Sequence, residues 1–271
     1  MHFLITGGAG FIGSHLTDLL LQSGHVVTAL DDFSTCPPDS LAETKARVIK
    51  GSVLDRSLVF DLVASCDYVF HLASVVGVRL AMARGIRTLK TNFLGTENVL
   101  AAATEYNKEV FIASSSAVLG KIVNLPAAES SSTLLGPAYK ASWLYSAAKL
   151  VEEHLAFAYY REKKTKVKVG RFFNVIGPRQ TGAYGMVVPT FITAALKGEP
   201  LLVYGDGSQT RTFVYIGDAL KGVEIVVKRG KPGRIYNIGG TEEISILSLA
   251  QKIIAMTKSS SPIKIIPYEK L

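Results

Sequence analysis

Near its N-terminus the chain reads Thr6-Gly7-Gly8-Ala9-Gly10-Phe11-Ile12-Gly13, directly after a short apolar segment at 2–5. That segment has the composition of a strand, and residues 11–23 have a helical pattern that stops at Gly24. Glycine lets backbone N–H groups approach a phosphate at the positive end of the helix. The order strand, glycine-rich turn, helix therefore predicts a dinucleotide site that includes Gly7, Gly10, Phe11, Ile12 and Gly13.

Two acids follow this turn at an informative distance. The next apolar segment, at 25–30, ends in Asp31-Asp32. In dinucleotide-binding folds an acid about 20 residues past the glycines accepts hydrogen bonds from the adenosine ribose. A carboxylate at this place would repel a 2′-phosphate, so the sequence favours NAD over NADP. Tight packing of the turn without a ligand is the alternative interpretation.

The composition indicates a well-packed globular protein. The 271 residues are 48% hydrophobic, with a mean hydropathy of +0.27. No apolar stretch approaches the ~18 residues of a membrane span, and we expect no signal peptide, because the first strand begins at residue 2. The two cysteines, Cys36 and Cys66, match no metal spacing. We therefore expect a cytoplasmic protein without a metal site or a membrane partner.

The net charge of +8 raises the possibility of a nucleic-acid partner. Most lysines are scattered, however, and the one basic cluster, at 161–168, lies between a helical pattern and a strand. A solvated surface turn explains that cluster, and a positive balance also suits anionic substrates. We expect no nucleic-acid partner.

Strand and helix signals alternate along the first part of the chain, which predicts a doubly wound parallel sheet of the Rossmann type. The candidate strands are 2–6, 25–30, 47–50, 68–72, 109–114 and 166–172, and the candidate helices are 11–23, 56–64, 86–106 and 142–161. Beyond Phe172 loops surround one clear helix at 187–197, with returning sheet elements at 211–229 and 234–238. We expect an NAD-binding domain at 1–172 and 209–240, interleaved with a smaller C-terminal substrate-binding lobe at 173–208 and 241–271.

A tyrosine and a lysine share one face of the helix predicted at 142–161. Tyr145 and Lys149 are four residues apart, so both side chains point into the same space. An ammonium beside a phenol lowers the pKa of the phenol, which can then remove a proton from a sugar hydroxyl. An exposed helix face is the usual explanation of such a pair, but the dinucleotide fingerprint favours a catalytic role here.

Three serines, Ser114-Ser115-Ser116, follow the apolar strand predicted at 109–114. Residues at the carboxyl end of such a strand face the ligand crevice of a doubly wound sheet. A hydroxyl there can donate a hydrogen bond to the reacting oxygen or accept one from it. Capping of a loop is the alternative for a run of serines.

With these features in place, the chain resembles the extended short-chain dehydrogenase/reductase family, specifically its NAD-dependent nucleotide-sugar epimerases and dehydratases. The resemblance runs from Phe3 to about Tyr268. Besides the glycine turn, the serines and the tyrosine–lysine pair, it is carried by His71-Leu72-Ala73-Ser74, Thr91-Asn92-Phe93-Leu94-Gly95-Thr96, Arg171-Phe172-Phe173-Asn174, Gly205-Asp206-Gly207-Ser208-Gln209-Thr210-Arg211 and Val214-Tyr215-Ile216-Gly217-Asp218.

The resemblance implies roles for particular residues. Ser115 would assist catalysis, Tyr145 would be the base and Lys149 its partner. The cofactor would contact Asp31, Asp32, Ser52, Val53, Leu72, Ala73, Ser74, Thr91, Tyr145, Lys149 and Phe173. The diphosphate and sugar of the substrate would contact Ser116, Asn174, Val187 and Arg211. The helices at 86–106 and 142–161 would form a homodimer through a four-helix bundle.

The chain departs from the family pattern in three places. Ala117 and Leu119 stand where dehydratases and decarboxylases typically carry glutamate and tyrosine, and Ser52 replaces an aspartate that often contacts adenine. Loss of an acid argues against β-elimination, which removes one proton and delivers another. The chain also stops at Leu271, whereas related proteins continue with a segment that helps to close the nucleotide pocket.

Three hypotheses follow from the resemblance. The first is a UDP-sugar 4-epimerase, in which a 4-keto sugar rotates between loss and return of hydride. The second is a relative of UDP-glucuronate decarboxylases or nucleotide-sugar 4,6-dehydratases, because the 4-keto group itself eases loss of the carboxylate. The third is a non-catalytic protein that binds NAD or a nucleotide sugar, which the substitutions Ala117 and Ser52 favour and the serine, tyrosine and lysine oppose.

Overall fold

The computed structural model describes residues 1–36, 40–122, 125–182 and 185–267. These residues form two compact units. Unit 1 comprises Met1–Phe172 and Ile216–Ile238, and unit 2 comprises Phe173–Tyr215 and Gly239–Leu271. Tyr268, to which the family resemblance extends, lies outside the described residues.

Unit 1 is built on a seven-stranded sheet in which every pair of neighbours is parallel. This is the predicted doubly wound sheet, in which the chain runs outward from β1 in both directions. In sheet order its strands are β10 (Arg234–Ile238), β6 (Val167–Phe172), β5 (Glu109–Ser115), β4 (Tyr68–His71), β1 (His2–Thr6), β2 (Val26–Asp31) and β3 (Arg47–Lys50).

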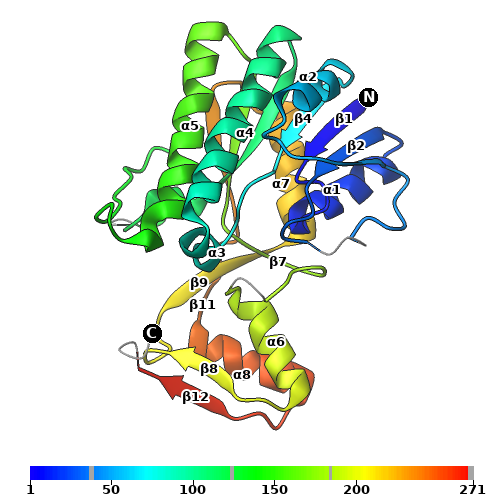
Figure 1. Cartoon of the computed structure of the whole chain (residues 1–271). Helices are drawn as coiled ribbons and strands as arrows, with labels where there is room; N and C mark the ends of the chain where they lie inside the picture. Colours follow the sequence, from blue (N-terminus) through cyan, green and yellow to red (C-terminus); the bar gives the residue numbers. More distant parts are fainter. Residues whose placement is uncertain (37–39, 123–124, 183–184, 268–271) are drawn as a thin grey trace. The chain divides into compact units, whose positions relative to one another are not determined.

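Helices cover both faces of this sheet (Figure 1). On one face lie α2 (Arg56–Ala64), α4 (Gly85–Glu105) and α5 (Leu144–Lys163), and on the other α1 (Phe11–Gln22) and α7 (Ile216–Arg229). The short helices α3 (Val78–Ala83), η1 (Ser116–Leu119) and η2 (Ala141–Trp143) complete the unit. The central strands β1, β4 and β5 are mostly buried, because both of their faces are covered.

The ends of the helices follow from local sequence. Gly24 has φ +77° just past the end of α1, a conformation that glycine adopts without strain. The Asp55 side chain accepts a hydrogen bond from Leu58 N at 3.1 Å and so caps the start of α2. Among the described residues, every helix is too short or too polar to span a bilayer.

Unit 2 contains two small sheets and two helices. One sheet has the order β11 (Glu243–Ser245), β9 (Thr210–Tyr215), β7 (Asn174–Ile176), and the other pairs β8 (Leu201–Tyr204) with β12 (Ile263–Ile266). Helices α6 (Val187–Lys197) and α8 (Ile246–Thr257) pack on each other and on β8. The core of the unit is formed by Phe191, Ala195, Leu201, Val203, Ile246, Leu249, Ala250 and Ile253.

The structure corrects three predictions of local structure. Residues 211–229 are not one sheet element, because β9 ends at Tyr215 and α7 begins at Ile216. Residues 209–215, assigned above to the NAD-binding domain, belong to unit 2, since β9 pairs with β7 and β11. The helix predicted from 142 begins at Leu144, after the separate turn η2.

Candidate active site

The glycine turn joins β1 to α1 in unit 1. Gly7 has φ +71°, and a Cβ there would lie 2.7 Å from Ala73 N, so no larger residue fits without a shift. A Cβ at Gly13 would overlap Gly7 O. These two glycines thus serve tight packing of the turn. The start of α1 points to a ligand as well, because Gly10 is its N-cap and, within the described residues, no side chain caps it.

Asp31 connects this turn to the end of β2. Its Oδ2 accepts a hydrogen bond from Ala9 N at 3.0 Å, and its Oδ1 accepts one from Phe33 N at 2.9 Å. Burial raises the pKa of the Asp31 carboxyl group, and the two backbone N–H groups oppose that shift. The neighbouring Asp32 is exposed and forms an ion pair with Arg87 at 3.0 Å. The structure thus places Asp31 against the glycine turn and directs Asp32 toward α4.

The loop after β4 is fixed by hydrogen bonds from both sides. Leu72 N donates to Thr6 O at 3.0 Å, and Ala73 N donates to Thr6 Oγ1 at 3.3 Å. Asn92 of α4 donates from Nδ2 to Ser74 Oγ at 2.9 Å and accepts from Val75 N at Oδ1, at 3.1 Å. The sequence analysis did not single out Asn92 as a residue that orders this loop.

A buried histidine at the end of β4 links the start of this loop to β1 and α4. His71 Nδ1 lies 2.7 Å from Thr6 Oγ1, and its Nε2 lies 2.9 Å from Thr96 Oγ1. Burial, together with the charge of Lys149, lowers the pKa of His71 to about 3. The ring is therefore neutral and connects β1, β4 and α4 without adding a charge.

The three predicted catalytic residues meet in unit 1. Tyr145 is 8% exposed in the first turn of α5, and the Ser115 hydroxyl at the end of β5 lies close enough to its phenol to influence its pKa. Burial raises the pKa of Tyr145, while Lys149 and Ser115 lower it. Lys149 is itself buried and donates from Nζ to Ala113 O at 2.9 Å. This arrangement can transfer a proton at the phenol oxygen.

Two glutamates that were not predicted as site residues follow this group on α5. Glu152 Oε2 accepts from Lys149 Nζ at 3.0 Å, and burial raises the pKa of Glu152 to about 7. Glu153 pairs through both oxygens with Arg171, at 2.8 Å to Nε and 2.7 Å to Nη2, and accepts from Ser114 Oγ at 2.6 Å. The residues quoted for the resemblance included Arg171 and Ser114, but nothing in the sequence indicated a common carboxylate partner.

The remaining predicted cofactor and substrate residues of unit 1 differ in how far they are buried. Val53 is buried against Gly95, where an added Cβ would lie 2.5 Å from the Val53 methyl group. Ser52 Oγ accepts from Leu54 N at 3.2 Å, which closes a local turn. Thr91 of α4 and Ser116, the first residue of η1, are both half-buried.

The other predicted ligand-binding residues belong to unit 2. Asn174 is exposed and donates from Nδ2 to Thr212 O at 2.8 Å. Arg211 is also exposed and donates from Nη1 to Thr210 O at 2.7 Å. Phe173 packs against Gly239, where a Cβ would lie 2.8 Å from the Phe173 Cβ. Val187 is the first residue of α6 and packs against the core of the unit.

Comparison with known proteins identifies the family. The sequence model of the "NAD dependent epimerase/dehydratase family" matches residues 3–239. The chain belongs to that family. A UDP-N-acetyl-alpha-D-glucosaminuronate decarboxylase of Bacillus cytotoxicus is 43% identical over an alignment of 271 positions, which covers 99% of this chain and 84% of the relative.

Two further relatives extend the range of reactions within the NAD-dependent epimerase/dehydratase family. UDP-glucuronic acid decarboxylase 1 of Danio rerio is 37% identical, and the match covers 97% of this chain but only 62% of that protein. The structure of UDP-glucose 4-epimerase from Thermotoga maritima with UDP-glucose aligns with a TM-score of 0.91 and 28% identity, over 98% of this chain and 86% of the other. Both decarboxylases and epimerases are therefore similar to this chain.

Membership in the epimerase/dehydratase family confirms three predictions: the Rossmann-type parallel sheet, the nucleotide-sugar enzyme class and NAD as the cofactor. The residues present fit this cofactor. The start of α1 offers backbone N–H groups to a diphosphate, and the Asp31 carboxylate lies beside the same turn. In the described part of the chain no group of three metal-ligating side chains occurs.

Proposed function

We propose that this protein is an NAD-dependent decarboxylase of a UDP-hexuronic acid, which oxidises the sugar at C4 before the carboxylate leaves. The observation that carries the proposal is the group formed by the buried Tyr145 and Lys149 and the half-buried Ser115. The proximity of the Lys149 ammonium and the Ser115 hydroxyl to the Tyr145 phenol, whose pKa both lower, supports proton transfer at a sugar hydroxyl. The decarboxylase relatives, on sugars that carry a carboxylate, favour this reaction over the 4-epimerisation that the sequence placed first.

In this proposal each residue acts at a defined point. Tyr145 removes the proton of the C4 hydroxyl, and Ser115 holds the same oxygen by a hydrogen bond. Bound NAD supplies the acceptor for the hydride that leaves C4. Lys149 stabilises the phenolate of Tyr145, since an ammonium one helical turn away lowers the pKa of the phenol. Burial of Tyr145 and Lys149 shields the phenol from water.

Cleavage of the C5–C6 bond then needs no additional acid near the serines. A 4-keto group lies β to the C6 carboxylate, so the electron pair of the broken C5–C6 bond moves onto the keto oxygen as carbon dioxide leaves. The enolate that remains takes up a proton at C5, and Tyr145 returns its proton to the C4 oxygen when hydride returns to C4. Tyr145 and Ser115 would hydrogen-bond that oxygen. Ala117, half-buried in η1, carries no ionisable group, and this route does not require one.

One observation favours a second candidate, a UDP-sugar 4-epimerase. Ala117 occupies the place where decarboxylases and dehydratases of the family typically have glutamate. Epimerisation needs only reversible hydride transfer and rotation of the keto sugar, so it is compatible with the same residues. In both candidates Asn174 and Arg211 would bind the diphosphate, because a guanidinium can pair with two phosphate oxygens.

The product identifies the reaction. Purified protein is incubated with NAD and, separately, with UDP-glucuronate, UDP-N-acetylglucosaminuronate, UDP-glucose and UDP-N-acetylglucosamine, and the products are analysed by mass and by NMR. We expect loss of carbon dioxide from one of the two uronates. An isomer of unchanged mass would replace the proposal by the epimerase. Binding of NAD and UDP without turnover of any of the four sugars would contradict both candidates.

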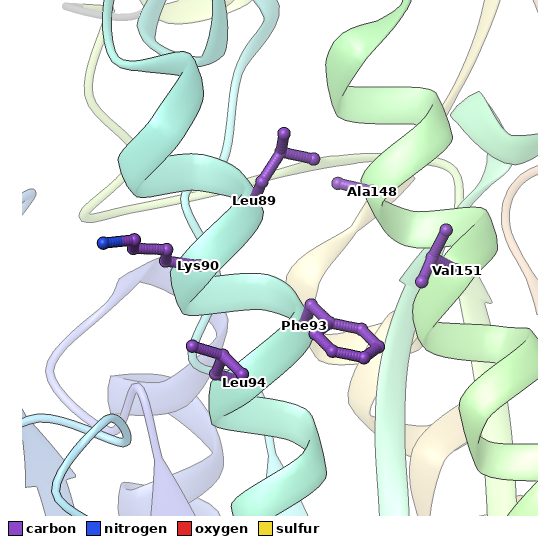
Figure 2. Close-up of a pocket in the computed structure, with 6 residues that line it drawn as sticks. All are labelled: Leu89, Lys90, Phe93, Leu94, Ala148 and Val151. Atoms are coloured by element: carbon purple, nitrogen blue, oxygen red, sulfur yellow. The ribbon is translucent and has the colours of Figure 1, made fainter.

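The exposed face of α4 and α5 supports a further part of the proposal, a homodimer. A groove of about 350 Å³ is lined by Leu89, Lys90, Phe93, Leu94, Ala148 and Val151 (Figure 2). Leu89, Phe93, Leu94 and Val151 are each 43–46% exposed. Apolar side chains that gather on two neighbouring helices are typical of a surface covered by a partner, and a second copy would form the four-helix bundle.

Light scattering after size-exclusion chromatography tests the dimer. Phe93→Glu places a charge in the centre of the groove and should convert the dimer to a monomer. Leu196→Glu is the matched control, because Leu196 is 70% exposed on α6 in unit 2 and lies outside the groove. A wild-type protein that is monomeric at micromolar concentration would contradict the homodimer.

The state of the cysteines supports a cytoplasmic location. Cys36 and Cys66 are free thiols, and burial raises their pKa to about 12 and about 11, respectively. Both are therefore protonated at neutral pH, and neither is activated for disulfide exchange. Cell fractionation of the tagged protein, followed by immunoblotting, tests this location, and recovery in the membrane or secreted fraction would contradict it.

A further inference from the structure

Glu152 has no part in the mechanism described above, although it touches a residue that does. Its side chain is 1% exposed, and its Oε2 forms an ion pair at 3.0 Å with Lys149 Nζ, which is 3% exposed. Its second oxygen, Oε1, has no hydrogen-bond partner among the described residues. Burial of a carboxylate with one unpaired oxygen is costly, so a stabilising role alone does not account for this residue.

The environment of Glu152 limits how its charge is compensated. The Asn92 amide of α4 lies close enough to lower the pKa of Glu152, but its well-formed hydrogen bond is given to Ser74 Oγ. Glu153, next to it on α5, raises the pKa of Glu152 and is itself bound to Arg171. Lys149 is therefore the cation that forms an ion pair with Glu152 and also lowers the pKa of the proposed base, Tyr145.

We propose that Glu152 is a positioning residue, which holds the Lys149 ammonium and weakens the help that Lys149 gives to deprotonation of Tyr145. The inference rests on the roles of Tyr145 and Lys149 in the proposed function. Lys149 donates both to Glu152 Oε2 and to Ala113 O, so its Nζ is held between α5 and β5. The pair carries one positive charge while Glu152 is protonated and none once Glu152 ionises.

The direction of the effect follows from the charges around the phenol. Lys149 lowers the pKa of Tyr145, and Glu152 raises it. The other titratable groups in the surroundings are Glu153, which is paired with Arg171, and His71 of β4, which is neutral. Removal of the Glu152 charge therefore leaves the field of Lys149 uncompensated, and the phenolate forms at lower pH.

A spectroscopic titration tests this without any turnover. The absorbance of phenolate is followed against pH in the full chain, and the same titration of a Tyr145→Phe variant is subtracted, which isolates Tyr145 from the other tyrosines. In the Glu152→Gln background the Tyr145 signal should move about one pH unit lower, which is ~10-fold more phenolate at a given pH on the rising limb. The matched control is Glu162→Gln, since Glu162 is exposed near the end of the same helix.

A second variant keeps the test decisive if Glu152→Gln does not fold. Glu152→Met removes the carboxyl group and fills a similar volume with an apolar chain, so it leaves Lys149 with Ala113 O as its partner, as Glu152→Gln does, but introduces no buried polar atom of its own. It should move the Tyr145 titration in the same direction. A purely structural role for Glu152 would change the melting temperature and leave this titration in place. Coincident titrations of wild type and of the variant that folds, or a shift to higher pH, would overturn the proposal.

The same variants separate this inference from the proposed function. If no sugar is turned over but the Tyr145 titration shifts as expected, the link between Glu152 and Tyr145 stands and the substrate assignment fails. If the protein is active but the titration does not move, Glu152 has no influence on the base and only the inference fails. With an active protein, the acid limb of kcat/KM should shift to lower pH by the same amount as the phenolate signal.

Discussion

Units 1 and 2 present their predicted functional residues in opposite ways. In unit 1 Tyr145 and Lys149 are buried, and Lys149 donates to Ala113 O of β5. In unit 2 Asn174 and Arg211 are exposed, and each donates to a nearby backbone carbonyl. Tyr145 and Lys149 are therefore fixed by the packing around them, whereas Asn174 and Arg211 remain in contact with solvent.

Under the proposed function, this difference corresponds to two physical tasks. A proton transfer requires fixed distances and a shielded charge, so its residues gain from burial and from partners on several elements. A diphosphate arrives from water with its own charge, and groups that bind it lose less if they stay solvated until it is present. The comparison predicts that substitutions in unit 1 change the chemical step or the stability, and that those in unit 2 change substrate affinity.

The largest effect is expected from Tyr145→Phe. The variant keeps the ring and removes the hydroxyl, so it should lower kcat by about 10²–10⁴-fold, the usual contribution of a positioned acid–base group. NAD binding, measured by calorimetry, should stay within error, because the glycine turn is untouched. Tyr106→Phe, at the exposed end of α4, is the matched control and should leave kcat unchanged. A Tyr145→Phe enzyme with wild-type kcat would contradict the proposed role of Tyr145 as the base.

The next effect concerns the stability of unit 1. Glu153→Gln leaves the Arg171 guanidinium, 4% exposed, without a negative partner and should lower the free energy of unfolding by about 3–5 kcal/mol. Urea unfolding measures it. The control is Glu224→Gln, which removes an exposed ion pair with Lys228 and should cost about 0–1 kcal/mol. Equal losses of unfolding free energy in both variants would show that a buried ion pair contributes no more to stability than an exposed one in this protein.

Much of unit 1 could be predicted from the sequence, because its signals are local. The alternation of apolar segments and helical patterns gives the parallel sheet, and the bounds of β1, β3 and α2 agree exactly with the predicted 2–6, 47–50 and 56–64. The glycine turn and the spacing of Tyr145 and Lys149 are likewise short-range patterns. They predicted residues that the fold brings together.

The missed features depend on contacts between distant segments. The apolar residues of α8 are buried by α6, β8 and β11, and β8 and β11 lay in segments interpreted from the sequence as loops. The link from Ser114 through Glu153 to Arg171 joins three elements, and no spacing along the chain shows it. Glu152 and Glu153 also looked like the polar side of a helix, whereas both are buried.

A smaller effect is expected in the pH dependence of stability. Burial raises the pKa of Glu152 from 4.5 to about 7 in the folded chain. The folded state therefore holds this proton more tightly than the unfolded state, so the resulting stability is full below pH 4.5 and is lost as the pH rises through about 7. The loss amounts to at most about 3 kcal/mol.

Urea unfolding of wild type and Glu152→Gln at pH 5 and pH 8 measures this loss. The glutamine variant cannot ionise, so its stability relative to wild type should rise between the two pH values. Glu162→Gln, which changes an exposed acid on the same helix, should keep a constant difference from wild type. A constant difference for Glu152→Gln as well would mean that its carboxyl group titrates alike in both states.

The smallest effect is expected in unit 2, from Arg211→Ala. A hydrogen bond to a charged group contributes about 1.5–3 kcal/mol, so KM and the Kd of UDP should rise about 10–100-fold while kcat changes little. Arg211→Lys should recover only part of the affinity, because an ammonium cannot pair with two phosphate oxygens at once. Lys252→Ala, another exposed cation in unit 2, is the control. If instead kcat falls and the Kd of UDP is unchanged, Arg211 acts on the chemical step, and exposure does not separate binding residues from catalytic ones in this protein.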